Sequence, residues 1–239
     1  MQLPKGMAYG NWDFPISTLR DLTFEIEIRG NVDRHPGRYL QLYQGDITGI
    51  GCYFGLQTDV AKPKYGGQGH GLLFSRWKTR DPSNARVAPN GWIENAGHEG
   101  GFVGVRTVMP WSAGKYRCTL AVVNDDVDGV WYEFAVTDHN TNETYSVGAL
   151  RFPAAEINSG GGTWTEVYSF AKSEEDVPET ELRVLSIAAN GMTVRPIRCR
   201  VSYQEFSRSD AFVDDGILIL CSGGKVVRTH EAKHYDLDA

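Results

Sequence analysis

The sequence has no hydrophobic run that approaches the roughly 20 residues a membrane-spanning helix requires. It also has no block of charge of one sign, because 24 lysine and arginine residues are interspersed with 30 aspartate and glutamate residues, a formal net charge of −6. We therefore expect no membrane insertion and no nucleic-acid partner, since nucleic acids select strongly basic surfaces. The composition stays even, without linkers or repeats, which predicts a single domain over residues 1–239.

Common catalytic and cofactor motifs are missing as well. The sequence contains no Gly-x-Ser-x-Gly elbow, no Gly-x-Gly-x-x-Gly strand-to-helix junction, no phosphate-binding loop and no Glu-x-Asp-x-x-Glu run of the laminarinase-like sandwich enzymes. The segment His98-Glu99-Gly100-Gly101 lacks the second histidine of the helical zinc-peptidase motif, and its glycines disfavour a helix. Serine hydrolase, zinc peptidase and nucleotide-dependent chemistry are therefore not predicted.

The cysteines are few and widely spaced. Cys52, Cys118, Cys199 and Cys221 include no Cys-x-x-Cys pair, which excludes the common zinc-knuckle and thioredoxin-type sites. Two disulfides in any of three connectivities remain open from the count alone. Because Cys118 and Cys199 lie inside strand-like runs, the pattern favours buried free thiols.

Glycine and aromatic residues, in contrast, are abundant: the chain has 27 glycines, and phenylalanine, tryptophan and tyrosine together make up 11% of it. Between Leu22 and Ile28 every second residue is apolar, the pattern of a strand with one buried face. Similar runs occur at Tyr39 to Gln44, Cys52 to Gln57, Leu72 to Trp77, Phe102 to Val108, Tyr116 to Asn124, Val130 to Asp138, Thr144 to Phe152, Trp164 to Phe170, Ile197 to Phe206, Ile217 to Cys221 and Lys225 to Thr229. Turn-forming glycine and asparagine pairs separate many of them. These runs predict an all-β fold, an antiparallel two-sheet sandwich of jelly-roll or concanavalin-like type.

Three segments are less regular. The run from Glu179 to Ala188 fits a short helix as well as a strand, and we leave it open. The stretch from Asp81 to Gly100 is predicted to be a long irregular loop, and loops of that length are often functional. The polar stretch from His230 to Ala239 is expected to fray.

The order of several motifs in the central segment resembles a known family. These motifs are Cys52-Tyr53-Phe54-Gly55-Leu56-Gln57, Leu73-Phe74-Ser75-Arg76-Trp77, His98-Glu99-Gly100-Gly101-Phe102-Val103-Gly104, Met109-Pro110-Trp111 and Gly114-Lys115-Tyr116-Arg117. Over residues 51–153 this order is similar to a family of functionally uncharacterised, concanavalin-like β-sandwich domains. The resemblance implies a sandwich fold, an association with glycans and an extracellular or cell-surface location, although the chain begins without a signal-peptide pattern. It implies no catalytic residues.

One loop has part of a calcium-binding pattern. Asn124-Asp125-Asp126-Val127-Asp128-Gly129 places oxygen ligands at alternate positions before a glycine, as in the first half of a calcium loop. The position that should hold a bidentate glutamate is Ala135, and strands rather than helices flank the segment. We therefore expect Asp126 and Asp128 to shape a hairpin turn, with no cofactor required and calcium as the only metal the loop suggests.

Aromatic and polar residues in the central segment suggest a glycan site. Tryptophan rings bind the apolar face of a pyranose, and arginine, amide or carboxylate groups bind its hydroxyls. The predicted ligand-binding residues are Trp77, Trp92, Arg76, His70, Glu94, Asn95 and His98. Arg76, Arg80 and Arg86 could instead pair with uronate or sialate carboxylates. The alternative to a glycan site is a structural role for these residues, in which the tryptophans fill the edge of the core, the arginines are solvated and His70 lies in a turn.

An enzyme and an interaction module remain alternatives to glycan binding. Glu25 and Glu27 share one strand face at a spacing of about 6.7 Å, within the range of a glycosidase pair, but they lie opposite the apolar residues, and the pattern favours solvated charges. His70 could act as a general base in a lyase. The sequence therefore predicts a carbohydrate-binding sandwich, with a glycan-cleaving hydrolase or lyase, or a protein-interaction or adhesion module, as alternatives. It leaves the ligand and the oligomeric state open.

Overall fold

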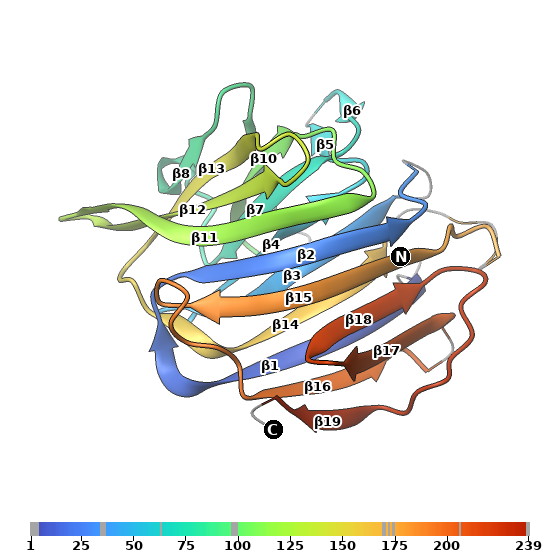
Figure 1. The fold of residues 1–239 in the computed structure, drawn as a ribbon. Coiled ribbons are helices and arrows are strands. Elements are labelled where there is room, and N and C mark those ends of the chain that lie inside the picture. The colour runs from blue at the N-terminus through green and yellow to red at the C-terminus, as the bar shows by residue number, and fades with distance from the viewer. Residues whose placement is uncertain are drawn as a thin grey trace.

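The computed structural model describes residues 5–33, 37–62, 64–96, 100–168, 171, 173, 175–205 and 207–237. In these residues, two large antiparallel sheets pack face to face, and a single turn of 3-10 helix at Pro82–Asn84 accompanies them (Figure 1). The predicted all-β, antiparallel two-sheet sandwich is confirmed. Within the same residues, no helix has the length and apolar character needed to cross a membrane.

The two sheets are named here by their place in the fold. In the described residues, the inner sheet has nine strands in the order β19 (Lys233–Asp236), β16 (Arg198–Tyr203), β1 (Lys5–Leu19), β14 (Ile157–Val167), β3 (Arg38–Ile47), β4 (Ile50–Gln57), β7 (Gly71–Trp77), β10 (Phe102–Val108) and β9 (Trp92–Ala96). The outer sheet there has eight, in the order β17 (Ser209–Asp214), β18 (Ile217–Ser222), β15 (Thr180–Ala189), β2 (Leu22–Gly30), β11 (Gly114–Asp126), β12 (Gly129–Asp138), β13 (Thr144–Phe152) and β8 (Ala85–Val87). A small hairpin joins β5 (Ala61–Lys62) and β6 (Gly66–Gly67).

The core lies between the two sheets and is rich in aromatic rings. On β2 the alternating residues Leu22, Phe24, Ile26 and Ile28 are all buried, as the period of two requires. The ring of Phe54 on β4 lies 6.0 Å from the ring of Phe24 and 4.6 Å from that of Phe134 on β12, so it connects the sheets. Burial of this apolar surface is the main driving force for the sandwich.

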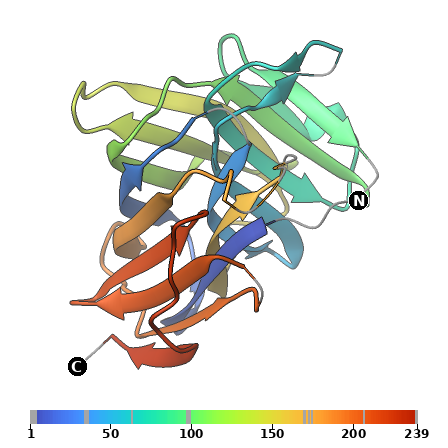
Figure 2. The same ribbon diagram turned by 90° about the vertical axis from the view of Figure 1, so that its right-hand side faces the viewer.

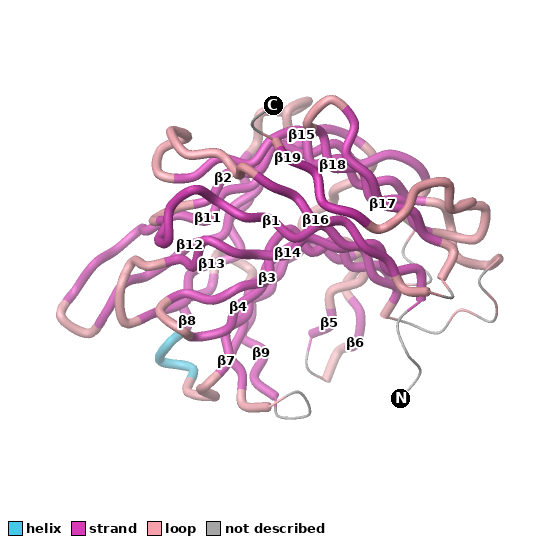
Figure 3. The backbone as a smooth tube through the Cα atoms, turned by 90° about the horizontal axis from the view of Figure 1, so that it is seen from below, coloured by secondary structure: helices cyan, strands magenta, loops and turns pink. Residues whose placement is uncertain are grey.

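The sandwich is bent into an arch, with the inner sheet on the concave side and the β5–β6 hairpin near the opening (Figure 3). Strand β1, from the start of the chain, lies between β14 and β16, which come from its second half (Figure 2). The concave side of the arch is therefore built from segments that are far apart in the sequence.

Several segments differ from the sequence-based expectation. The segment from Glu179 to Ala188, which was left open, lies almost entirely in strand β15. The stretch from Asp81 to Gly100, predicted as an irregular loop, contains strands β8 and β9. The stretch from His230 to Ala239, expected to fray, contains strand β19, which pairs with β16. Strand β1 was not predicted, because Gly10 and Ala8 contribute little apolar signal. Gly10 is small for a packing reason: a Cβ atom there would lie 2.3 Å from a methyl group of Leu218 on the outer sheet.

All four cysteines are free, as expected. Cys52, Cys118 and Cys199 are buried in the core, and Cys221 is half-buried. Burial raises the pKa of the Cys199 thiol to about 12, with a smaller contribution from Asp13. These thiols are therefore packing groups at neutral pH.

Candidate functional site

The alternation of side chains divides the inner sheet into a core side and a concave side. Leu40, Phe54 and Phe74 point to the core, and their neighbours on the same strands point the other way. The concave side forms a cleft of about 390 Å³. Its lining residues are Tyr39, Gln41, Gln44, Tyr53, Gln57, Asp59, Ala61, Trp77, Glu94, Phe102, Arg106, Trp164, Glu166 and Tyr168.

A row of three aromatic rings forms part of the cleft. Tyr39 on β3, Tyr53 on β4 and Trp77 on β7 lie on neighbouring strands. The ring centroids of Tyr39 and Tyr53 are 5.9 Å apart, and those of Tyr53 and Trp77 are 5.0 Å apart. This aromatic row offers apolar ring surface across three strands at one wall of the arch.

The hydroxyl of Tyr39 is buried at the base of this row. Tyr39 is 5% exposed, and its hydroxyl has no hydrogen-bond partner among the described residues. Burial, followed by the charge of nearby groups, holds the pKa of Tyr39 well above its ordinary value, so the phenol is neutral. A buried polar group without a partner is uncommon in folded proteins, and at a cleft it is a donor that a ligand can satisfy.

Arg106 lines the cleft from β10, the strand next to β7. Its side chain is 5% exposed, and its Nη2 lies 3.1 Å from a carboxylate oxygen of Glu94 on β9. Its Nη1 donates to the hydroxyl of Ser75 and to the carbonyl of Val105, both at 3.0 Å. The guanidinium is therefore occupied by protein groups, and it fixes the position of the Glu94 carboxylate.

The far end of the cleft carries amides and a second carboxylate. The indole Nε1 of Trp164 on β14 donates to Glu166 at 3.2 Å, and the amide of Gln41 donates to Gln44 at 3.3 Å. Each of these acceptors keeps further lone pairs for a ligand. Hydroxyl-rich ligands are the class that such a mixture of rings, amides and carboxylates fits best.

The β5–β6 hairpin closes one rim of the cleft. Tyr168 donates its hydroxyl to the carbonyl of Asp59 at 2.8 Å, and Asp59 accepts the backbone N–H of Gly69 at 3.0 Å. Trp92 donates its indole N–H to the carbonyl of Ala61 at 3.0 Å. These bonds tie the hairpin to both β9 and the end of β14, so the rim is held from two sides.

Of the six predicted ligand residues that the structure describes, it places Trp77 and Glu94 in the cleft. Trp92 is 9% exposed and clamps the hairpin, with the Lys62 ammonium 5.5 Å from its ring. We therefore revise its expected role from sugar platform to hairpin anchor. His98 lies outside the described residues.

The other three predicted residues point elsewhere. Arg76 projects to the core side, where its guanidinium lies 4.8 Å from the ring of Phe152. Asn95 alternates with Glu94 and donates to the carbonyl of Arg80 at 3.2 Å. The ring of His70 stacks on Trp111, and Nδ1 of His70 donates a 2.5 Å hydrogen bond to the carbonyl of Trp111. His70 therefore has structural contacts, in line with the alternative of a histidine in a turn. Neighbours in a strand face opposite sides, and that rule alone separates Arg76 from Trp77.

The chain is similar to a small group of solved structures at low sequence identity. No protein-family model and no curated protein matches the chain. Solved structures similar to it include scytalido-glutamic peptidase with a transition state analog inhibitor, with a TM-score of 0.49 and 9% identity, and the same peptidase with a peptide-based transition state analog, at 0.48 and 8%. Both cover 93% of this chain and 100% of the peptidase chain. SCP-B, a member of the eqolisin family of peptidases in a complex with the tripeptide Ala-Ile-His, is similar at 0.40 and 8%, over 93% of this chain and 99% of its own. Nothing about activity follows from likenesses of this size.

The outer sheet carries the carboxylate pair noted in the sequence. Glu25 accepts from Arg117 at 2.6 Å and lies 2.8 Å from His139, and Glu27 accepts from Arg29 at 2.8 Å. All these groups lie on the face away from the core and on the sheet opposite the cleft. They form a ladder of surface ion pairs, as the solvated-charge alternative predicts.

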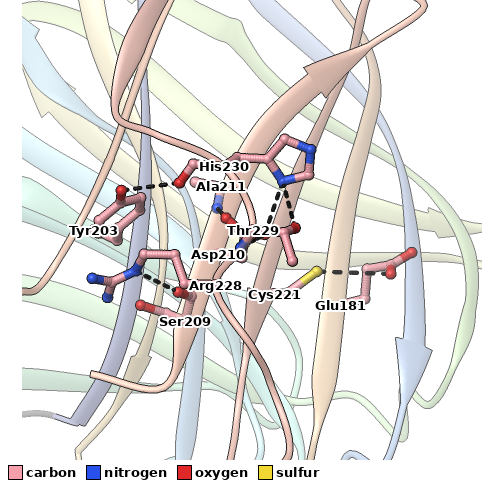
Figure 4. A network of polar contacts seen from close by, with 9 residues as sticks. All are labelled: Glu181, Tyr203, Ser209, Asp210, Ala211, Cys221, Arg228, Thr229 and His230. Atoms are coloured by element: carbon pink, nitrogen blue, oxygen red, sulfur yellow. Dashed lines mark hydrogen bonds and ion pairs between the residues drawn. The ribbon is translucent and has the colours of Figure 1, made fainter. Parts of the chain in front are cut away.

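A second polar cluster fastens the loop after β18 (Figure 4). The buried carboxylate of Asp210 accepts from the hydroxyl and N–H of Thr229 and lies 2.9 Å from Nδ1 of His230. Burial tends to raise the pKa of Asp210, but the hydrogen bonds from His230 and Thr229 outweigh it and lower the pKa. Arg228 donates to the carbonyl of Ser209 and stacks on Tyr203 at 3.6 Å. We interpret this cluster as a clip that holds the loop to β16 and β17.

The predicted hairpin at Asp126 joins β11 and β12 and projects beyond the sandwich (Figure 1). One oxygen of Asp126 accepts the N–H of Asp128 at 3.0 Å, and the other accepts from Asn124 at 2.8 Å and from Trp131 at 3.2 Å. Arg86 stacks on the Trp131 ring at 3.6 Å and is not among the residues that line the cleft. Among the described residues, no three His, Cys, Asp or Glu side chains are grouped so that they could hold a metal ion.

Replacement of Asp126 by alanine should lower the free energy of unfolding by about 1 kcal/mol, because the hairpin loses its side-chain hydrogen bonds. Millimolar calcium should leave the melting temperature of both the parent and the Asp126→Ala variant unchanged. Differential scanning calorimetry with and without calcium measures both effects. A calcium-dependent rise of several degrees that disappears in the variant would show that the loop is an ion site.

Proposed function

We propose that the protein binds a glycan in the cleft of the inner sheet. The observation that supports this proposal is the composition of the cleft: the aromatic row of Tyr39, Tyr53 and Trp77 lies among amide and carboxylate groups on a concave surface. A ring face packs against the apolar face of a pyranose, and the amides and carboxylates bind its hydroxyls. The unpartnered hydroxyl of Tyr39 adds a buried donor.

The placement of the carboxylates favours binding over glycoside cleavage. Glycosidases hold their two carboxyl groups about 5 to 9.5 Å apart on either side of the bond they cleave. In this cleft Glu94 is on β9 and Glu166 is on β14, with β10, β7, β4 and β3 between them. Glu94 is also engaged by Arg106. Glu166 in turn accepts from the indole N–H of Trp164. Since both carboxylates are held by donors of the protein, we assign them to binding of sugar hydroxyls.

Trp77→Ala should weaken glycan binding roughly five- to tenfold, because a stacked ring contributes about 1 kcal/mol beyond its area. Trp77→Phe, which keeps a ring face, should lose less. A glycan-array screen identifies a ligand, and isothermal titration calorimetry then measures the affinity of each variant. Circular dichroism and melting temperature show that each variant is folded.

Tyr65→Ala provides the matched control, since Tyr65 is 73% exposed and lies on the hairpin outside the cleft lining. Its affinity should equal that of the parent. If folded Trp77→Ala binds the same glycan as tightly as the parent does, the cleft is not the binding site. Release of shortened products from the bound glycan, abolished by Glu94→Gln or Glu166→Gln, would establish cleavage instead of binding.

A further inference from the structure

A second hollow continues the cleft across the inner sheet. It has a volume of about 360 Å³ and shares Gln44 and Trp164 with the cleft. Its other lining residues are Asn11, Trp12, Asp13, Gly160, Gly161 and Gly162. Since both hollows lie on the concave side and meet at Trp164, they form one groove that runs across the strands from β9 to β1.

Three consecutive glycines on β14 form part of this second hollow. Gly160, Gly161 and Gly162 pair with Asp13, Trp12 and Asn11 on β1. A Cβ atom at Gly160 would meet nothing within 4 Å, so the space above that glycine is open. At Gly161 the space is filled, because a Cβ atom there would lie 2.2 Å from the Tyr43 ring, and at Gly162 it would lie 3.1 Å from Asn11. Gly160 is therefore the position at which a ligand has room to lie close to the backbone.

The length of the groove matches a chain of sugars rather than one sugar. The path from β9 to β1 crosses β10, β7, β4, β3 and β14, with neighbouring strands about 4.8 Å apart. Because the sheet is bent (Figure 3), its concave side is shorter than the roughly 29 Å of a flat sheet. A pyranose in an extended chain advances by about the same distance as one strand. The groove, which spans several strands, therefore has room for several sugar units.

The charges along the groove select against acidic sugars. Among its described lining residues, four are carboxylates, Asp13, Asp59, Glu94 and Glu166, and one is a cation, Arg106. Arg106 is buried and paired with Glu94, so it offers little to an incoming anion. Carboxylates accept hydrogen bonds from hydroxyls but repel uronate, sialate and sulfate groups.

We infer that the ligand is an uncharged linear oligosaccharide that lies across the strands, with its central units on the aromatic row and its outer units in the glycine-lined hollow beyond Trp164. This inference rests on the proposed function and adds to it the charge, the length and the direction of the ligand. The arginine-based expectation of uronate or sialate is replaced by a neutral chain, because Arg76, Arg80 and Arg86 do not line the groove.

Calorimetric titration with di- to hexasaccharides of the cello, xylo, manno and laminari series tests the inference, with oligogalacturonates as the acidic comparison. In the series that binds, the hexasaccharide should bind about tenfold more tightly than the trisaccharide, since the added units contact the second hollow. Gly160→Trp should reduce the hexasaccharide affinity to that of the trisaccharide and leave the trisaccharide affinity unchanged. Val123→Trp, at a 52% exposed position on the outer sheet, is the matched control and should bind like the parent.

The outcomes separate the inference from the proposed function. Equal affinities for the tri- and hexasaccharide, or a hexasaccharide affinity unaffected by Gly160→Trp, would overturn the extended groove while Trp77-dependent binding still supports the glycan site. Tighter binding of oligogalacturonate than of every neutral series would overturn the charge assignment alone. If no oligosaccharide of either class, and no glycan on an array, binds the folded protein, the proposed function and the inference both fail.

Discussion

Arg38→Ala is expected to lower the free energy of unfolding by about 2 to 4 kcal/mol. Arg38 is 1% exposed, and its guanidinium donates to the carbonyl of Pro178 at 2.5 Å and to the carbonyl and hydroxyl of Ser222 at 2.9 and 2.6 Å. These bonds join β3 of the inner sheet to the end of β18 and the segment before β15 in the outer sheet. Truncation leaves three buried acceptors without a donor and opens a cavity.

Loss of the Arg38 charge also has a stabilising effect that opposes the loss of its hydrogen bonds. Burial lowers the pKa of Arg38 to about 10, which means that the charged form pays a desolvation cost although it still predominates at pH 7. Removal of the charge relieves this cost, and the net loss is therefore smaller than the sum of three charge-assisted hydrogen bonds. Arg38→Met, which fills the volume, should lose less stability than Arg38→Ala.

Urea unfolding of the two variants measures the effect as a lower midpoint at an unchanged slope. The melting temperature should fall by roughly 5 to 15 °C in a chain of this size. Arg198→Ala is the control, because Arg198 is half-exposed, and its pairing with Asp236 is a surface contact worth at most about 1 kcal/mol. An unfolding midpoint for Arg38→Ala equal to that of Arg198→Ala would show that the buried guanidinium does not stabilise the packing of the sheets.

Arg106→Met should affect both stability and glycan binding. The variant loses the contacts of Arg106 with Glu94, Ser75 and the carbonyl of Val105, at an expected cost of about 2 to 3 kcal/mol in unfolding free energy, since Glu94 itself is only partly buried. Without the guanidinium, the Glu94 carboxylate is free to move. We therefore expect the affinity for a bound glycan to fall tenfold or more.

A double-mutant cycle separates these two effects. Arg106→Met, Glu94→Gln and the double variant are compared by urea unfolding and by calorimetric titration, and Arg106→Lys tests whether a cation alone restores binding. If Arg106 acts by positioning Glu94, its loss should cost little further affinity once Glu94 is already glutamine. Full additivity of the two losses in affinity would contradict that role.

The sequence predicted the fold better than the site, for a physical reason. Strands such as β2 and β4 have one buried face, so their alternation of apolar and polar residues is a local property of the chain. Strand β1 escaped notice because Gly10, which packs under Leu218, gives no apolar signal at its position. Strand β19 is half-exposed and polar, and only its pairing with β16 defines it.

The cleft depends on strand order, which no local pattern contains. Trp77 and Glu94 were predicted because they lie near each other in the sequence, on strands that both neighbour β10. Tyr39, Trp164 and Glu166 were missed because β3 and β14 become neighbours only through long-range pairing, whereas β4 is the next strand after β3 in the chain. A signal for Tyr39 was nevertheless present: it precedes the buried Leu40 and Leu42 on the other side of its strand, at a position where a solvent-facing sheet would carry a small or charged group.

The position of β1 between β14 and β16 also has a kinetic consequence. Strand β1 pairs with segments near residues 160 and 200, so the inner sheet cannot be completed until those later segments have also left the ribosome. Such non-local pairing places refolding in the range of about milliseconds to seconds rather than microseconds. During that interval both edges of β1 are unpaired backbone, and the nascent chain is open to strand addition by other chains. The groove, with Trp164 beside Gln41, exists only once this late pairing is complete.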